Sequence, residues 1–246
     1  MATHLISNIP DPSGLLIVGM HRSGTSCLAG SLQQRGLYLG DVHEWNPHNL
    51  KGNRENQQVM DLNNEILEFN QGSWDTPPST ITWNIRHKEK RDLIISSLQD
   101  SKQIWGFKDP RTLITLGFWE DGLSQPFQLI GTYRHPYAVA ASLHKRNGLP
   151  IESGLKLWYS YNNKLLNKWR ATPFPLLCFD ILPEKYLLHI EKACTYLGLP
   201  EKNTATPFFK SELRSHSKQP VNFSGVHEKH LDLYESLQKA HHTFMS

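Results

Sequence analysis

The sequence contains few cysteines and no long hydrophobic run, and each shortage excludes a class of protein. Its 246 residues include 3 cysteines, Cys27, Cys178 and Cys194, which are widely spaced in apolar surroundings. An odd number at such spacings indicates buried reduced thiols rather than a disulfide framework or a CxxC metal site. The longest apolar stretches are far shorter than the ~20 residues that a transmembrane helix needs. Residues 1–14 also lack the basic and apolar regions of a signal peptide, so we expect a soluble, cytoplasmic protein.

The excess of one sign of charge over the other is also small. Lysine and arginine total 26 against 23 aspartates and glutamates, which leaves a net charge of +3. That excess is too small for a basic stripe along a nucleic acid, although a local basic pocket for an anionic ligand can still form. The 13 histidines show no HExxH spacing, and the adjacent His241 and His242 lie in a weakly patterned tail, so we expect no metal site.

Short apolar runs alternate with segments of helical periodicity along the chain. The runs typical of buried strands are 15–18, 103–107, 127–133 and 174–179, and the helical segments are 25–35, 56–69, 89–98, 136–147, 152–170 and 184–197. This alternation predicts an α/β fold of three layers, in which helices cover both faces of a mostly parallel sheet. We expect one domain over residues 1–246, with 1–13 as a leader and 200–246 as a C-terminal loop and helix that cover the site.

The strongest local pattern is the segment 15–28, LLIVGMHRSGTSCL. A strand that ends at Gly19 and a helix that begins after Gly24 expose backbone amides at the helix start, where the helix dipole also attracts anions. The spacing of the two glycines matches a Walker A loop, but Thr25 stands where that motif has lysine, which disfavours a nucleoside triphosphate. Arg22 can supply the positive charge instead. The sequence therefore predicts an anion cradle formed by Arg22, Ser23, Gly24, Thr25 and Ser26.

A second cluster of polar residues follows the strand expected at 127–133. Arg134 stands at the carboxyl end of this strand, the edge where ligands bind in open α/β sheets and where Arg22 also lies. Its guanidinium can bind a phosphate through two parallel hydrogen bonds. The helix that follows places Ser142 and Arg146 one turn apart on the same face, so both can join Arg134 at a phosphate.

A third candidate lies in the sequence WGFKDPRT at 105–112. The strand projects Lys108 from the same edge of the sheet, and Asp109 and Pro110 form a turn typical of a helix start. The ammonium group of Lys108 is a compact, mobile charge that suits a developing negative charge on a leaving oxygen. The neighbouring Arg111 can hold either Asp109 or the ligand.

Taken together, and in their order along the chain, the three segments resemble the superfamily of sulfotransferases that use 3′-phosphoadenosine-5′-phosphosulfate (PAPS). The chain looks closest to the bacterial branch related to tyrosylprotein sulfotransferases, and the resemblance covers residues 15 to about 200. It implies that the loop at 22–26 binds the 5′-phosphosulfate and that Lys108 touches the sulfuryl group. Arg134, Ser142 and Arg146 would then bind the 3′-phosphate.

The segment 49–70 is also similar to the NPxGYWEN…LNxxLL stretch of that family. The matching residues are Gly52, Glu55, Asn56, Leu62 and Asn63. Asn53 and Arg54 stand where an aromatic pair is usual, so the shape of the acceptor pocket is expected to depart from the family pattern.

The resemblance implies direct in-line transfer of a sulfuryl group from PAPS to a hydroxyl or amine of a small-molecule acceptor, with 3′,5′-adenosine bisphosphate as the product. Neither a metal nor a covalent intermediate is implied. Arg22, Lys108 and the loop amides would stabilise charge around the transferring group. We expect a monomer or homodimer without nucleic-acid or membrane partners. Two alternatives stay open, a P-loop kinase variant that tolerates Thr25 and a nucleotide-binding module that has lost its base.

The base that removes the acceptor proton is expected in or beside the long loop at 41–54. A loop of this length in a compact domain is usually functional or mobile. Glu55 matches the acidic position of the bacterial-type stretch and is the first candidate, although a carboxylate at a helix start can also compensate the dipole. His43 is the second, because an imidazole is a suitable base at neutral pH. Glu44 is the third and Asp41 lies nearby; Glu44 is close to the chain separation of the catalytic glutamate in tyrosylprotein sulfotransferases.

Overall fold

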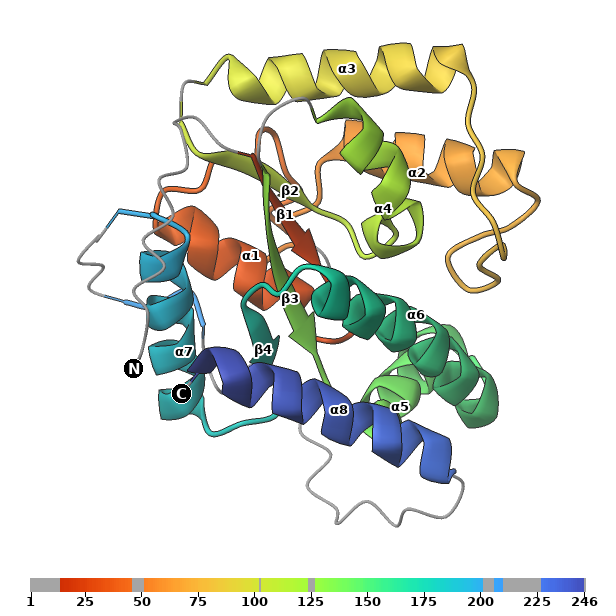
Figure 1. The fold of residues 1–246 in the computed structure, drawn as a ribbon, viewed down its shortest axis with the longest axis vertical. Coiled ribbons are helices and arrows are strands. Elements are labelled where there is room, and N and C mark those ends of the chain that lie inside the picture. The colour runs from red at the N-terminus through yellow and green to blue at the C-terminus, as the bar shows by residue number, and fades with distance from the viewer. Residues whose placement is uncertain are drawn as a thin grey trace.

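Four short strands form one parallel sheet in the part of the chain that the structure describes (Figure 1). This computed structural model describes residues 14–45, 51–101, 103–123, 127–200, 206–209 and 227–245. The strands are β1 (Gly14–Val18), β2 (Trp105–Lys108), β3 (Phe127–Tyr133) and β4 (Leu176–Cys178), in the spatial order β2-β1-β3-β4. Every pairing is parallel, so the four strands end at the same edge of the sheet.

Helices cover both faces of this sheet because successive side chains of a strand point to opposite sides. Leu15 and Ile17 of β1 pack into the core beneath α1 and α7, whereas Leu16 and Val18 pack into a larger core shared by the remaining helices. The helices are α1 (Thr25–Gln34), α2 (Gln57–Phe69), α3 (Ile85–Gln99), α4 (Thr112–Gly122), α5 (Pro136–Asn147), α6 (Ile151–Ala171), α7 (Pro183–Tyr196) and α8 (Glu228–Met245). The expected three-layer α/β fold is therefore confirmed.

Two helices differ from the sequence prediction. Helix α3 begins at Ile85, four residues before the predicted start, because Asn84 and His87 form a reciprocal capping box. The Asn84 side chain accepts a hydrogen bond from the His87 amide, and the His87 ring accepts one from the Asn84 amide, both at 3.2 Å. Helix α4 was expected only as a helix-starting turn. Most of its residues are buried, so its sequence lacks the polar stripe that identifies an amphipathic helix.

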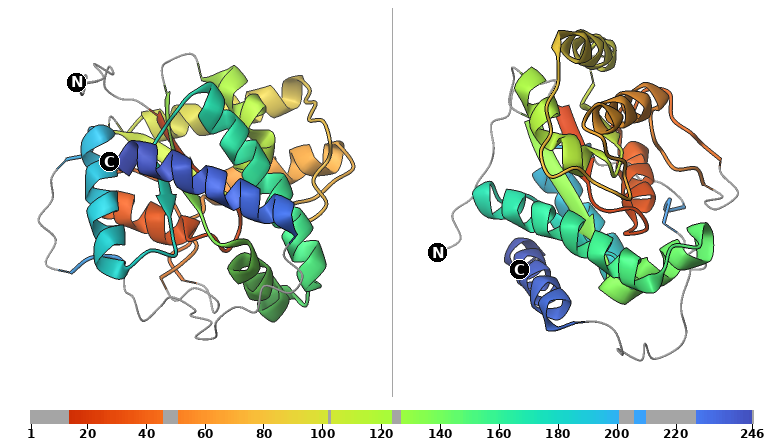
Figure 2. Two further views of the ribbon diagram at one scale, coloured as in Figure 1. Left: turned by 60° about the horizontal axis from the view of Figure 1, so that its bottom comes forward. Right: turned by 90° about the vertical axis from the view of Figure 1, so that its right-hand side faces the viewer.

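The C-terminal helix α8 packs against α6 and β4, and both views of Figure 2 show it beside α6. The expected leader at 1–13 lies outside the described residues, as do residues 210–226 of the C-terminal segment that was expected to cover the site. Among the helices that the structure describes, none is both long enough and apolar enough to cross a membrane.

Candidate active site

A cavity of about 380 Å³ opens where β1 and β2 end, at the edge where parallel sheets bind ligands. Most of the predicted site residues line it. The lining residues are His21, Arg22, Thr25, Ser26, His43, Asn53, Glu55, Met60, Trp74, Lys108, Pro110, Arg111, Leu143, Arg146 and Asn147. Arg134 and Ser142 are outside this set, but both form hydrogen bonds to Arg22. The structure thus brings the three predicted segments together.

The start of α1 has the geometry of an anion cradle. Gly24 precedes the helix in the left-handed conformation, with φ of 85°, and no side chain caps the helix or places an acidic group in its first turn. The helix dipole and the first backbone amides therefore favour a negative group here. A β-carbon at Gly24 would lie 2.2 Å from the ring of Phe179, so the tight packing as well as the backbone conformation requires glycine.

Arg22 lies in the loop between β1 and α1, in a left-handed conformation with φ of 66° that is unusual for a residue with a side chain. Its Nε donates a hydrogen bond to Ser142 Oγ at 2.8 Å, and its carbonyl oxygen accepts one from Arg134 Nη1 at 3.4 Å. Burial, followed by the positive charges of Arg146 and Arg134, lowers the pKa of Arg22 to about 10. A bound anion would relieve the repulsion among these three guanidinium groups.

Arg134 is oriented by a carboxylate that the sequence analysis missed. Asp180 accepts a hydrogen bond from Arg134 Nε at 3.0 Å and another from the backbone amide of His135 at 2.7 Å. On the other side, the Trp158 indole donates to the Arg134 carbonyl oxygen at 2.9 Å. Asp180 stands just after β4, so a charged residue following a buried strand, the pattern that identified Arg134, could also have identified Asp180.

Lys108 reaches the cradle from the neighbouring strand and supplies a lysine that the loop itself lacks. Its side chain is only 1% exposed, and its Nζ lies 2.5 Å from Glu55 Oε1 and 3.4 Å from Ser26 Oγ. Ser26 belongs to the first turn of α1, and Glu55 directly precedes the N-cap of α2. One buried ammonium group therefore joins the anion cradle to the first candidate base.

Asn63 of α2 fixes the turn that carries Lys108. Its Nδ2 donates hydrogen bonds to Asp109 Oδ2 at 3.0 Å and to Thr112 Oγ1 at 3.1 Å. Its Oδ1 accepts bonds from Thr115 Oγ1 at 2.6 Å and from the Trp119 indole at 2.9 Å. This fully buried amide is thus fully satisfied, and it locks α2 to the start of α4.

Arg111 pairs with Asp109 and also lines the cavity. Asp109 Oδ1 accepts hydrogen bonds from Arg111 Nη1 at 2.9 Å and from the Arg111 backbone amide at 3.0 Å. Burial raises the pKa of Asp109 and the nearby Glu55 charge adds to this rise, whereas Arg111 opposes it. Of the two roles that the sequence left open for Arg111, the structure contains the contact with Asp109.

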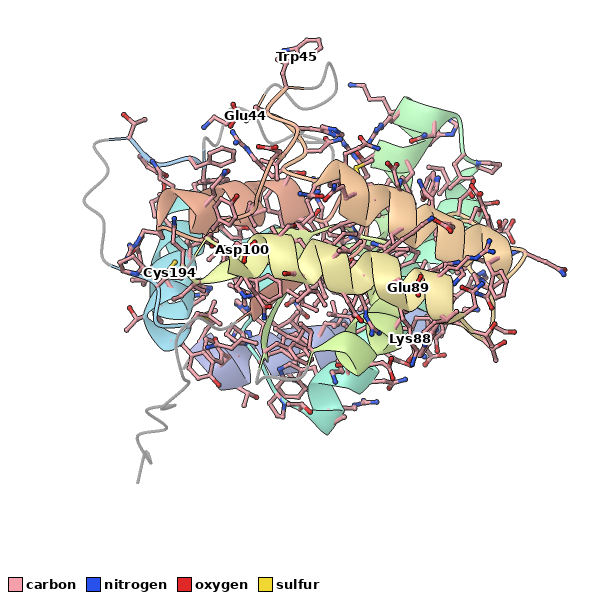
Figure 3. All side chains as sticks on the ribbon, turned by 90° about the horizontal axis from the view of Figure 1, so that it is seen from above. Glu44, Trp45, Lys88, Glu89, Asp100 and Cys194 are labelled. Atoms are coloured by element: carbon pink, nitrogen blue, oxygen red, sulfur yellow. The ribbon has the colours of Figure 1, made fainter. Side chains whose placement is uncertain are left out.

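Backbone pairing holds His43 beside Glu55. The His43 amide donates to the Glu55 carbonyl oxygen at 3.1 Å, and the His43 carbonyl oxygen accepts from the Arg54 amide at 3.1 Å. His43 and Glu55 both line the cavity. Glu44 is exposed instead, and its carboxylate pairs with Arg54 Nη1 at 2.9 Å. Figure 3 shows Glu44 close to Trp45, which projects from the surface of the molecule.

His21 is a cavity residue that the sequence analysis did not single out. Its ring lies 4.7 Å from Trp74 and 6.1 Å from Tyr161, measured between ring centroids. Burial is the main cause that lowers its pKa well below the ordinary value, and the nearby positive charges, Arg111 first, lower it further. The imidazole is therefore neutral at physiological pH. The signal that could have identified His21 as a site residue is its position inside GMHRSGTS, between the strand and the anion cradle.

The cysteines do not line the cavity, and none of the three forms a disulfide. Cys178 and Cys194 are buried, and burial raises the pKa of Cys194 to about 12. Across the described ranges, no group of three or more histidine, cysteine, aspartate or glutamate side chains is placed to hold a metal ion.

The fold is similar to that of a solved sulfotransferase domain. The structure matches the "Sulfotransferase Domain from the Synechococcus PCC 7002 Olefin Synthase" with a TM-score of 0.52 and 19% sequence identity, over 97% of this chain and 97% of that chain. At this level of identity the likeness shows a shared fold. No family model matches the chain, and no curated protein matches its sequence.

Proposed function

We propose that this protein is a sulfotransferase that moves a sulfuryl group from PAPS to a hydroxyl or amine of a small-molecule acceptor. The observation that carries this proposal is the position of Lys108 Nζ, between Ser26 of the anion cradle and the carboxylate of Glu55. Donor site, cation and candidate base meet at one point, which is the arrangement that transfer of an anionic group requires. The shared fold with a sulfotransferase domain gives further support.

The residues present fit PAPS as the donor. The amides at the start of α1, together with Thr25 and Ser26, suit the 5′-phosphosulfate, because they offer donors without a competing acidic side chain. Arg134 and Ser142 suit the 3′-phosphate, since each contacts Arg22 and thereby joins the two anion sites. Arg146 lines the same cavity and is close enough to Arg22 to lower its pKa.

Each side chain then has a defined task in the transfer. Glu55 accepts the acceptor proton as the acceptor oxygen or nitrogen attacks sulfur, and the bond from sulfur to the leaving phosphate oxygen breaks. Lys108 and Arg22 stabilise the charge that develops on that oxygen and on the sulfuryl group. His43 is the second candidate for the base, since the backbone holds it next to Glu55.

Thermal unfolding with nucleotides tests the donor assignment. At a hundredfold excess over its Kd, adenosine 3′,5′-bisphosphate should stabilise the protein by about 2.7 kcal/mol. AMP and ATP should give much smaller shifts at the same concentration, because AMP lacks the 3′-phosphate and the loop lacks the Walker A lysine. Equal shifts with AMP would contradict the 3′-phosphate site, and a larger shift with ATP would favour the kinase-like alternative.

An acceptor screen with PAPS tests the transfer itself. We expect sulfated product from at least one small hydroxyl or amine compound, with no loss of rate in EDTA. A requirement for magnesium would contradict the proposed chemistry. Tight binding of adenosine 3′,5′-bisphosphate without transfer to any acceptor would identify a nucleotide-binding module that is not an enzyme.

A further inference from the structure

The carboxylate of Glu55 is the nearest partner of Lys108. The Nζ–Oε1 distance of 2.5 Å is much shorter than the 3.4 Å from Nζ to Ser26 Oγ on the cradle. Both side chains of the pair are buried, Lys108 to 1% and Glu55 to 10% exposure. In such surroundings the attraction between opposite charges is strong, and so is the cost of leaving either charge unpaired.

Among the residues that the structure describes, no other cation near Glu55 is as well placed to replace Lys108. Arg111 is bound to Asp109, and Arg22 gives its Nε hydrogen bond to Ser142. His21 is surrounded by positive charges and is neutral. His43 lies beside Glu55 through its backbone. Any anion that draws Lys108 toward the cradle therefore removes the main positive partner of Glu55.

We propose that Glu55 and the nucleotide donor compete for Lys108, so that donor binding releases Glu55 to act as the base. This inference rests on the proposed function, because it requires the leaving phosphate oxygen to lie next to Ser26. As Lys108 turns from Glu55 to that oxygen, Glu55 is left as a buried carboxylate without its cation. Glu55 can then accept the acceptor proton in place of its contact with Lys108, so the base becomes effective only when the donor is in place.

The competition predicts that removing the charge of Glu55 strengthens nucleotide binding. Adenosine 3′,5′-bisphosphate serves as the probe, and calorimetry gives its Kd without any acceptor. Glu55→Gln should lower this Kd by at least about fivefold, the smaller end of coupling between linked sites. Glu68→Gln removes the same charge from the exposed surface of α2 and should leave the Kd unchanged.

A double-mutant cycle separates competition for Lys108 from simple repulsion between Glu55 and the phosphates. If the effect passes through Lys108, Glu55→Gln tightens binding in the parental protein but not in a Lys108→Met background. Equal tightening in both backgrounds would mean direct repulsion and would overturn the proposal, as would no tightening in the parental protein. Failure of the parental protein to bind the probe would instead overturn the proposed function.

Discussion

The charged residues in and beside the cavity form two halves that pair their charges differently. The arginine half, which comprises Arg22, Arg134 and Arg146, gathers three guanidinium groups around the ends of β1 and β3. Within it, Arg22 bonds to a neutral hydroxyl, and Asp180 pairs with Arg134. The lysine half, which comprises Lys108, Arg111, Glu55 and Asp109, pairs each cation with its own carboxylate.

This difference indicates how a cavity can bind a strongly anionic donor and still keep a base. A bound anion would relieve the repulsion within the arginine half, so under the proposed function we expect this half to contribute mainly to donor affinity. Each cation of the lysine half already has a carboxylate partner, so we expect its charges to become available to a ligand only after a rearrangement. We therefore expect substitutions in the lysine half to affect mainly turnover and substitutions in the arginine half to affect mainly donor binding.

We expect the largest effect on the rate of transfer at Glu55, because no member of the arginine half can take its place in accepting the proton of the acceptor. Glu55→Gln should reduce single-turnover sulfuryl transfer by about 10²–10⁴, while nucleotide binding persists. His43→Ala and Glu44→Gln are the comparison variants, and Glu44→Gln should be close to the parental rate because its carboxylate pairs with Arg54. A nearly normal rate in Glu55→Gln, together with an inactive His43→Ala, would move the role of base to the histidine.

Lys108→Ala should reduce kcat by about 10²–10³, since it removes the charge beside the leaving oxygen. The Kd for the nucleotide should change much less, because the loss of a cation is partly offset by the loss of its contact with Glu55. Stopped-flow transfer and calorimetry measure the two quantities separately. A variant that binds the nucleotide poorly but transfers at the parental rate would place Lys108 in donor recognition.

The arginine half depends on the backbone of the cradle, and Gly24 tests this dependence. Gly24→Ala should cost more than the roughly 1–2 kcal/mol of a left-handed alanine, because its β-carbon would also meet the ring of Phe179. Gly148→Ala is the matched control, since Gly148 has φ of 71° and open space around it. Urea unfolding of both variants should give a larger loss for Gly24→Ala. Equal losses would mean that the ring moves aside easily.

The smallest expected effect is at Ser142, which contributes one neutral hydroxyl. Ser142→Ala should weaken binding of adenosine 3′,5′-bisphosphate by about tenfold or less, the range of one hydrogen bond. Binding of AMP, which has no 3′-phosphate, should not change. A similar loss for both nucleotides would show that Ser142 acts only by orienting Arg22.

The elements that frame the arginine half could be predicted from the sequence because their signals are local. The strand β3 was predicted with its observed bounds, and α5 was predicted to end before Gly148, which is left-handed. Arg134 directly follows β3 and Arg22 lies in the loop that follows β1, and parallel pairing brings both to one edge. No comparable local signal marks α4, whose buried residues surround the helix instead of forming a stripe.

The lysine half was less predictable because its contacts join residues distant in sequence. Lys108 and Glu55 were each candidates, but their contact depends on Asn63 bonding across α2 and α4. Asn63 follows Leu62 in the apolar stripe of α2, and a polar residue at such a place is a weak sign that it has a buried hydrogen-bond partner. The ring contact of His21 with Trp74 likewise depends on tertiary packing that no local pattern encodes.

The parallel sheet also determines how the protein can be attached to a surface or to a fusion partner. The first described residue, Gly14, pairs with Trp105 and Phe127 at the amino-terminal edge of the sheet, whereas the cavity opens at the opposite edge. A strand rises about 3.3 Å per residue, so β1 separates the two edges by roughly 15 Å. A tether joined ahead of Gly14 would therefore begin on the side away from the cavity. We expect immobilisation through that end to leave the cavity accessible from solution.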